Sequence, residues 1–307
     1  MKQDLPQPMT SRTRRYWLRL TLFTLAMLGV GALTVIFVAV PIHAADVMSY
    51  PPRRPVCCRT PADFGLHYED VSFPTSDGLT LRGWYVPGQN GAAIIFAHGG
   101  GGNRSGTGQL EQATALAERG FGILLFDQRD HGDSDGAQTS FTGSDVLAAL
   151  NYLRNRSDVD PDRIGAIGLS LGAINIVHAA AQDSGLKAMV LDGLGQSGSA
   201  DLPPPTSLVE ALPAAQRAMM FLILRLRGVV DQPVIDSLSR MSPRPTLFIA
   251  GTGQDLERET VRRYFAVTSK PKEIWEIPEG SHAYTWAARP QEYTQRIVDF
   301  FEQSLLK

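Results

Sequence analysis

The pattern around Ser170 favours the chemistry of a serine nucleophile. Gly168-Leu169-Ser170-Leu171-Gly172 follows the apolar run Ile164 to Ile167 and opens an amphipathic segment, Leu171 to Gln182. A sharp turn between a strand and a helix lifts a serine hydroxyl above a sheet, and glycines on either side let the backbone pass closely. We therefore predict that the hydroxyl of Ser170 attacks a carbonyl carbon.

A second Gly-x-Ser-x-Gly pattern, from Gly132 to Gly136, lacks this context. It follows a charged loop and leads into polar residues without helical periodicity. Asp and Gly neighbours are typical of a turn. We therefore interpret its serine, Ser134, as a turn residue.

A serine nucleophile needs a base, and the base needs an acid that orients it. His282 follows the last apolar run, and its imidazole can accept a serine proton near neutral pH. Asp255 follows the run Thr246 to Ala250, which gives the chain order Ser, Asp, His. Asp255 is the predicted acid, and Asp192 and Glu257 stay open as alternatives.

The oxygen that becomes negative during such an attack needs two hydrogen-bond donors. The glycine-rich loop from His98 to Asn103 follows another apolar run, and its glycines let backbone N–H groups turn inward. We predict one donor at the backbone of Gly100 and the other at that of Leu171. His98 and His131 lie in loops at the same edge, where they can line the site without acting as the base.

The elements that must position these residues follow from short apolar runs that alternate with amphipathic segments. A hairpin is predicted first, from Tyr68 to Pro74 and Leu79 to Pro87. The later strands are predicted at Ala92 to Ala97, Gly122 to Phe126, Ile164 to Ile167, Ala188 to Leu191, Thr246 to Ala250 and Glu273 to Ile277. Helices are predicted at Gln109 to Glu118, Ser144 to Arg154, Leu171 to Gln182, Glu257 to Val267 and Pro290 to Leu306. This alternation indicates an α/β fold with chemistry at the carboxyl ends of its strands.

The stretch 193–240 departs from the alternation because it contains a long apolar helix, predicted from Ala214 to Arg227. We interpret this stretch as a short helical cap. Two roles stay open for it. The helix packs over the sheet edge, or it forms a lid that lines an apolar pocket or touches a bilayer.

From about Tyr68 onward the sequence resembles the α/β-hydrolase superfamily. The His-Gly loop, the segment from Asp127 to Ser134, the pentapeptide around Ser170, Asp255 and Gly280-Ser281-His282 occur in that superfamily's order. The chain is most similar to membrane-anchored hydrolases related to serine aminopeptidases and dienelactone hydrolases. The resemblance implies a mostly parallel eight-stranded sheet with an antiparallel second strand, a Ser-Asp-His triad and no cofactor; no metal is predicted.

Two positions depart from the superfamily's usual pattern. Asp255 lies four residues after Gly251, the glycine that ends a strand, where a spacing of three is usual. This departure leaves the identity of the acid open. Asp130-His131 stands where a glycine is common, which affects only a role in lining the site.

The N-terminal part of the chain contains a candidate membrane span, Leu20 to Val40. This run has no charged residue, and its length at 1.5 Å per residue is roughly 31 Å, about the hydrocarbon core of a bilayer. Residues 1–19 are basic, whereas arginines after the span are fewer and more distant. The positive-inside rule then predicts a cytoplasmic N-terminus and an extracytoplasmic catalytic domain, as in a bacterial plasma membrane.

Two other readings place the domain on the same side of the membrane. Ile42-His43-Ala44-Ala45 can serve as a signal-peptidase site. Thr13 to Arg19 resembles a twin-arginine export signal.

Residues 41–65 are rich in proline and are predicted to be a stiff tether before a catalytic domain at 66–307. The only cysteines, Cys57 and Cys58, are neighbours in this tether. Adjacent cysteines rarely bridge one another, and metal sites need more ligands. We expect no catalytic role for these thiols, with an intermolecular disulfide or lipid attachment as alternatives.

The formal net charge of −2 argues against nucleic acid as a partner and favours a small-molecule or acyl-chain substrate. We predict a serine hydrolase that cleaves a carboxylic ester or thioester through a covalent acyl-enzyme. The alternatives are an aminopeptidase-like peptidase and a catalytically silent, membrane-tethered binding module. Natural substrate and oligomeric state do not follow from the sequence.

Overall fold

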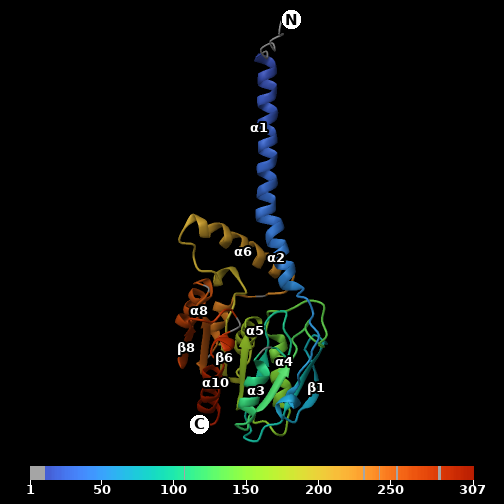
Figure 1. The fold of residues 1–307 in the computed structure, drawn as a ribbon, viewed down its shortest axis with the longest axis vertical. Helices are drawn as coiled ribbons and strands as arrows, with labels where there is room; N and C mark the ends of the chain where they lie inside the picture. Colours follow the sequence, from blue (N-terminus) through green and yellow to red (C-terminus); the bar gives the residue numbers. More distant parts are fainter. Residues whose placement is uncertain (1–10, 107, 231, 242, 254, 283–284) are drawn as a thin grey trace, which may run out of the picture.

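In the computed structural model, a long N-terminal helix extends from one end of an α/β domain (Figure 1). The structure describes residues 11–106, 108–230, 232–241, 243–253, 255–282 and 285–307. The domain contains an eight-stranded sheet with the order β1-β2-β4-β3-β5-β6-β7-β8. β2 is antiparallel to β1 and β4, and the other neighbouring strands are parallel. The mostly parallel sheet with an antiparallel second strand is therefore confirmed.

All the predicted strands are present, and their ends lie within two residues of the predicted ends. The strands are β1 (Glu69–Pro74), β2 (Thr80–Val86), β3 (Ala93–Ala97), β4 (Gly122–Phe126), β5 (Ile164–Leu169), β6 (Leu186–Asp192), β7 (Thr246–Gly251) and β8 (Lys272–Ile277). β3, β4, β5 and β7 are buried along their full length, as expected for strands covered on both faces.

The predicted helices are confirmed as well, and they cover the two faces of the sheet. They are α3 (Gln109–Ala117), α4 (Ser144–Arg154), α5 (Leu171–Gln182), α8 (Asp255–Val267) and α10 (Pro290–Leu305). Short elements that were not predicted are α7 (Val234–Arg240), α9 (Thr285–Ala288) and the 3₁₀ turns η2 (Pro61–Phe64) and η3 (Ser199–Asp201).

The cap helix α6 (Leu208–Leu226) begins six residues before the predicted start at Ala214. Pro213, which directly precedes the predicted start, lies inside the helix. The helix begins earlier because the hydroxyl of Ser207 accepts a hydrogen bond from the backbone N–H of Glu210 at 3.3 Å. This is an N-cap, and the serine followed three residues later by glutamate was its signal in the sequence.

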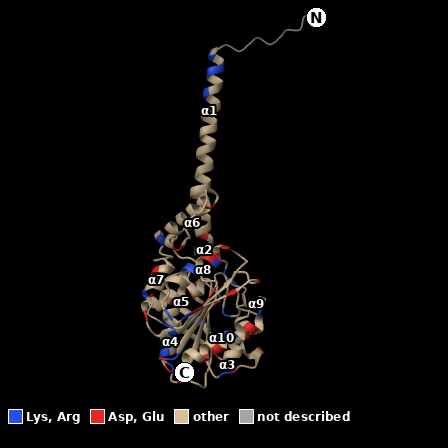
Figure 2. Ribbon diagram, turned by 90° about the vertical axis from the view of Figure 1, so that its left-hand side faces the viewer, with Lys and Arg blue, Asp and Glu red and all other residues tan. Residues whose placement is uncertain are grey.

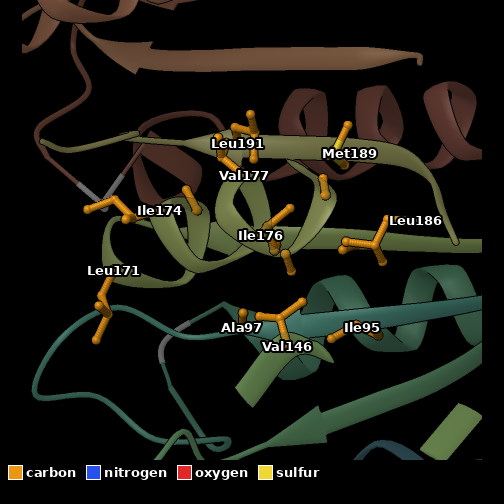
Figure 3. Packing of buried hydrophobic residues seen from close by; sticks show 14 of the residues in the cluster. Ile95, Ala97, Val146, Leu171, Ile174, Ile176, Val177, Leu186, Met189 and Leu191 are labelled. Atoms are coloured by element: carbon orange, nitrogen blue, oxygen red, sulfur yellow. The ribbon is translucent and has the colours of Figure 1, made fainter. Parts of the chain in front are cut away.

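α5 lies at the centre of the hydrophobic core and fixes the position of Ser170. Figure 3 shows Ile176 and Val177 of this helix among Ile95 of β3 and Met189 and Leu191 of β6. All five are fully buried, and full burial of each large side chain stabilises the fold by roughly 1.5–3 kcal/mol. The packing holds the N-terminus of α5 against the carboxyl end of the sheet.

The N-terminal helix runs without a break through α1 (Ser11–Thr34), the π-helical turn η1 (Val35–Ala39) and α2 (Val40–Ser49). Among the described residues, this is the one helix long and apolar enough to cross a membrane. Its basic residues gather at its start (Figure 2). The prediction of a tether at 41–65 is therefore wrong for residues 41–49, which are helical and belong to the helix that packs against α6. The wider π turn accommodates Pro41, whose ring and missing N–H would break a regular helix.

Residues 51–60, which we call the strap, also lie against the domain. Arg53 donates to the carbonyl oxygens of Ser134 and Gly136, both at 2.7 Å. The side chain of Asn103 donates to the carbonyl oxygen of Pro55 at 3.1 Å. The strap therefore does not leave the domain free to swing beneath the N-terminal helix. Within it, Cys57 and Cys58 form a disulfide, which corrects the expectation that these adjacent cysteines stay unbridged.

Candidate active site

Ser170 occupies the sharp turn between β5 and α5 in a conformation that non-glycine residues seldom adopt, with φ of 49° and ψ of −107°. Such a conformation costs about 1–3 kcal/mol and persists where the surrounding packing enforces it. A Cβ on Gly172 would lie 1.9 Å from the carbonyl oxygen of Ala97, and one on Gly168 would lie 2.5 Å from the nitrogen of Ala173. The two glycines are therefore required by close backbone contacts.

The predicted base lies next to this serine. Nε2 of His282 is 2.9 Å from Oγ of Ser170, although the two residues are 112 positions apart in the sequence. His282 follows β8, and its loop contacts the end of β7 so closely that a Cβ on Gly251 would lie 2.5 Å from the oxygen of Gly280. The side chain of His282 is 40% exposed, so a substrate can reach it.

The acid beside the histidine is Glu257. Its Oε2 lies 2.7 Å from Nδ1 of His282, and its Oε1 accepts the backbone N–H of Gly251 at 3.0 Å. Asp255, the predicted acid, is instead 89% exposed and pairs with Arg258. The structure therefore corrects the prediction of Asp255 and selects the glutamate among the alternatives.

The helical periodicity of α8 explains why the carboxylate of Glu257, and not that of Asp255, faces His282. The helix already begins at Asp255, and its buried residues are Glu257, Thr260, Val261 and Tyr264. These positions are spaced i, i+3, i+4 and i+7, which is one face of a helix. The same period, extended backward from Val261 and Tyr264, would have identified Glu257 in the sequence.

Asp192, the other alternative, has a different role. It is fully buried at the end of β6, and it accepts hydrogen bonds from Thr285 and, at 2.9 Å, from the hydroxyl of Tyr293. Burial raises the pKa of Asp192 to about 6. These contacts tie β6 to α9 and α10.

The histidines of the site differ in their electrostatics. The hydrogen bond to Glu257 raises the pKa of His282 above its ordinary value of 6.5, although burial acts in the opposite direction. Burial lowers the pKa of His98 to about 3, and it also lowers the pKa of His131. His98 and His131 are therefore neutral in the pH range where His282 titrates.

His98 and His131 each bind the backbone of a loop beside the site, at the sheet edge where the sequence places them. Nε2 of His98 accepts the backbone N–H of Gln128 at 3.0 Å, and Nε2 of His131 accepts that of Gly101 at 3.0 Å. Ser134, interpreted as a turn residue, is buried and donates to the carbonyl oxygen of Asp127 at 2.6 Å.

The two predicted oxyanion donors lie next to each other. A Cβ on Gly100 would be 4.0 Å from Cβ of Leu171. In the described part of the chain, neither backbone N–H has a hydrogen-bond partner. Leu171 is the first residue of α5, where helical N–H groups lack intrahelical partners and favour negative charge. Both donors are thus available to an oxygen of a bound molecule.

Two cavities meet at His282. One, of about 430 Å³, is lined by the glycine loop, Ser170 and the strap residues Arg54 and Pro55. The other, of about 180 Å³, is lined by Leu194, Gly195, Gln196, Leu256, Glu257 and Thr260. Within the described ranges, no group of three or more His, Cys, Asp or Glu side chains is arranged to hold a metal ion.

Residues 92–219 match the family described as alpha/beta hydrolase fold. The uncharacterized protein Rv2307c of Mycobacterium tuberculosis is 34% identical over 220 residues, which cover 69% of this chain and 72% of that protein. The chain therefore belongs to the α/β-hydrolase family.

Other relatives cover most of the chain. The uncharacterized protein YfhR of Escherichia coli is 29% identical over 251 residues, 77% of this chain and 81% of that protein. The alpha/beta hydrolase domain-containing protein WAV2 of Arabidopsis thaliana is 25% identical over 303 residues, 90% and 93% of the two chains. Among solved structures, the Pyrococcus furiosus esterase Pf2001 aligns with a TM-score of 0.67 and 24% identity over 84% of this chain and 98% of its own. That likeness shows the same fold.

Proposed function

We propose that this chain is a serine hydrolase that cleaves a carboxylic ester or thioester through a covalent acyl-enzyme. Membership of the α/β-hydrolase family supports hydrolase chemistry. The observation that carries the proposal is the continuous series of contacts from Ser170 to His282 at 2.9 Å and from His282 to Glu257 at 2.7 Å. The nucleophile, its base and the acid that orients the base are thus within hydrogen-bond reach.

The proposed reaction has two halves. Oγ of Ser170 attacks the carbonyl carbon while its proton passes to Nε2 of His282, and Glu257 stabilises the imidazolium that forms. The carbonyl oxygen becomes negative and accepts hydrogen bonds from the N–H groups of Gly100 and Leu171. The tetrahedral intermediate then expels an alcohol or thiol, which takes the proton from the imidazolium. Water, deprotonated by the same histidine, releases the acid and restores the serine.

The lining of the two cavities favours an ester or thioester over a peptide with a free N-terminus. Leu194 and Leu256 border the cavity beside the histidine, which suits an apolar acyl chain or alcohol. Glu257 is the one carboxylate among the described residues that line either cavity, and it is already bonded to His282. No second carboxylate of this lining is placed to bind a substrate ammonium group.

Parallel assays of p-nitrophenyl esters, acyl thioesters and aminoacyl p-nitroanilides test the substrate class. We expect turnover of the esters and thioesters, with kcat/KM at least roughly tenfold above that for the anilides, because the described lining offers apolar contact and no carboxylate other than Glu257 to pair with an amine. Faster turnover of the anilides would instead identify a peptidase. A folded protein inert toward every substrate would identify a binding module.

The contact between His282 and Glu257 predicts the pH dependence of the reaction. Because the base acts in its neutral form and its pKa is raised above 6.5, kcat/KM should be low at acidic pH and rise with a midpoint above 6.5. Glu257→Gln should move this midpoint to lower pH, since the carboxylate no longer stabilises the imidazolium. Asp255→Asn is the matched control and should leave the midpoint unchanged. The profile is measured as kcat/KM between about pH 5 and 9.

We also propose that α1 spans a membrane with its N-terminus in the cytoplasm and the catalytic domain outside. The apolar run and the basic residues at its start support this orientation. Ala45, the last residue of the candidate cleavage motif, is fully buried within a helix that packs against α6. That burial favours a retained anchor over a cleaved signal.

A further inference from the structure

The cap helix α6 presents an apolar stripe that the other described residues leave uncovered. The stripe consists of Leu208, Leu212, Ala215, Met219, Leu222 and Leu226, and all of these side chains are exposed. The exposed fraction is 91% for Leu208, 50% for Leu222 and 79% for Leu226. Their spacing of alternating four and three residues places them on one face of the helix.

The stripe faces away from the catalytic domain. The buried residues of α6 are Met220, Phe221 and Leu224, which lie on the opposite side of the helix and pack in the core. α6 is thus apolar on two faces, of which one is covered by the domain. Figure 1 shows the helix at the end of the domain from which α1 extends.

The contact between α6 and the N-terminal helix fixes the depth of the stripe. Nε2 of Gln216 donates to the carbonyl oxygen of Ile36 at 3.0 Å, and Ile36 belongs to the uncharged run from Leu20 to Val40. Ile36 lies about 24 Å along that run, whereas the hydrocarbon core is about 30 Å thick. If the run spans the bilayer from its first residue, α6 meets it just inside the outer boundary.

Charged residues at the C-terminal end of α6 lie level with the first charged residue after the apolar run, as expected if both lie outside the hydrocarbon core. Arg225 and Arg227 lie on either side of the stripe, near its C-terminal end. Arg227 pairs with Asp46 at 2.7 Å, and Asp46 is the first charged residue after the apolar run. The exposed side chain of Arg225 at this level can extend to lipid phosphates while the apolar face stays below it.

We propose that α6 is an interfacial helix whose stripe inserts into the outer leaflet of the bilayer that α1 crosses. This inference rests on the proposed membrane span. α2 packs against α6, and the strap is hydrogen-bonded to the domain, so these contacts keep the stripe close to the membrane while the anchor is inserted. The catalytic domain is then held against the lipid surface, which suits substrates that reside in that leaflet.

Fluorescence quenching by brominated lipids tests the docking of α6. The full-length chain and its Leu222→Trp and Glu118→Trp variants are reconstituted in phosphatidylcholine vesicles, with or without bromine at the upper acyl positions. Emission of the unsubstituted chain is subtracted in each case. The added tryptophan at 222 should lose roughly half or more of its emission in brominated vesicles, as expected for a side chain within the acyl region. The tryptophan at 118, exposed at the end of α3, should lose almost none.

Three further readouts separate the causes of failure. Resistance of the chain to extraction by alkaline carbonate reports whether α1 spans the bilayer, and labelling of Ser170 by a fluorophosphonate reports whether the catalytic domain is folded and active. An unquenched tryptophan at 222 in a chain that resists extraction would overturn the docking alone. A chain released by carbonate would overturn both the span and the docking. If the tryptophan at 222 is unquenched and cross-linking finds two copies in contact through α6, the stripe is instead the contact surface for a second copy of the chain. The alternating spacing of four and three residues in the stripe is also that of a coiled-coil seam.

Discussion

Ser170→Ala should lower kcat for ester hydrolysis by a factor on the order of 10⁶, because it removes the proposed nucleophile. The variant retains both oxyanion donors and both cavities but has no atom that can form the acyl-enzyme. His282→Ala should lower kcat by a similar factor, because the serine hydroxyl then has no base at 2.9 Å. The measurement is the initial rate with a saturating p-nitrophenyl ester.

Ser134→Ala provides the matched control, since Ser134 lies in the other Gly-x-Ser-x-Gly pattern. Its hydroxyl accepts the backbone N–H of Arg82 at 2.8 Å and donates to the carbonyl oxygen of Asp127. Loss of these buried bonds should lower the free energy of unfolding by about 1–3 kcal/mol while the folded enzyme retains its kcat. Comparable losses of kcat in Ser170→Ala and Ser134→Ala would mean that Ser170 is not the nucleophile.

Glu257→Gln should lower kcat by a factor on the order of 10³ to 10⁴. The amide nearly preserves the shape of the side chain, but it is neutral, and its NH₂ group can face Nδ1 of His282. The imidazole then adopts the wrong tautomer, and the imidazolium loses the carboxylate that stabilises it. Rates are measured at saturating substrate and at the optimum pH of each variant, so that a shift in pKa is not mistaken for a loss of rate.

Asp255→Asn is the control for this substitution. Its carboxylate is 89% exposed and bonded to Arg258, so the variant should keep kcat within about twofold of the unsubstituted chain, as surface changes away from a site usually do. The reverse order, a large loss in Asp255→Asn and a small one in Glu257→Gln, would show that the histidine is oriented differently during turnover.

The order of strands and helices could be predicted because each element carries its own local pattern. Buried strands are short apolar runs, and the helices between them are amphipathic, so even the ends of α4 and α5 agree with the prediction. The contact between Ser170 and His282 was also predictable, since the glycines beside Ser170 and the late position of His282 are visible in the sequence.

The acid was harder to predict because the choice depends on the rotation of a helix. Two carboxylates two residues apart on α8 point about 200° apart, and spacing from Gly251 alone does not tell which one faces the core. Residues 41–49, predicted as part of the tether, were mispredicted for another reason. The prolines of residues 41–65 indicate a tether, but the π turn before Pro41 and the tertiary contacts of α2 and the strap override that local preference.

Mass-spectrometric mapping of a fluorophosphonate adduct tests the assignment of the nucleophile most directly. After incubation of the full-length chain with the probe, the modified peptide is sequenced. The adduct is expected on Ser170 in the unsubstituted chain and in Ser134→Ala, and it should be absent from Ser170→Ala. A folded chain that forms no adduct, or one that carries it on another residue, would contradict the proposed serine hydrolase.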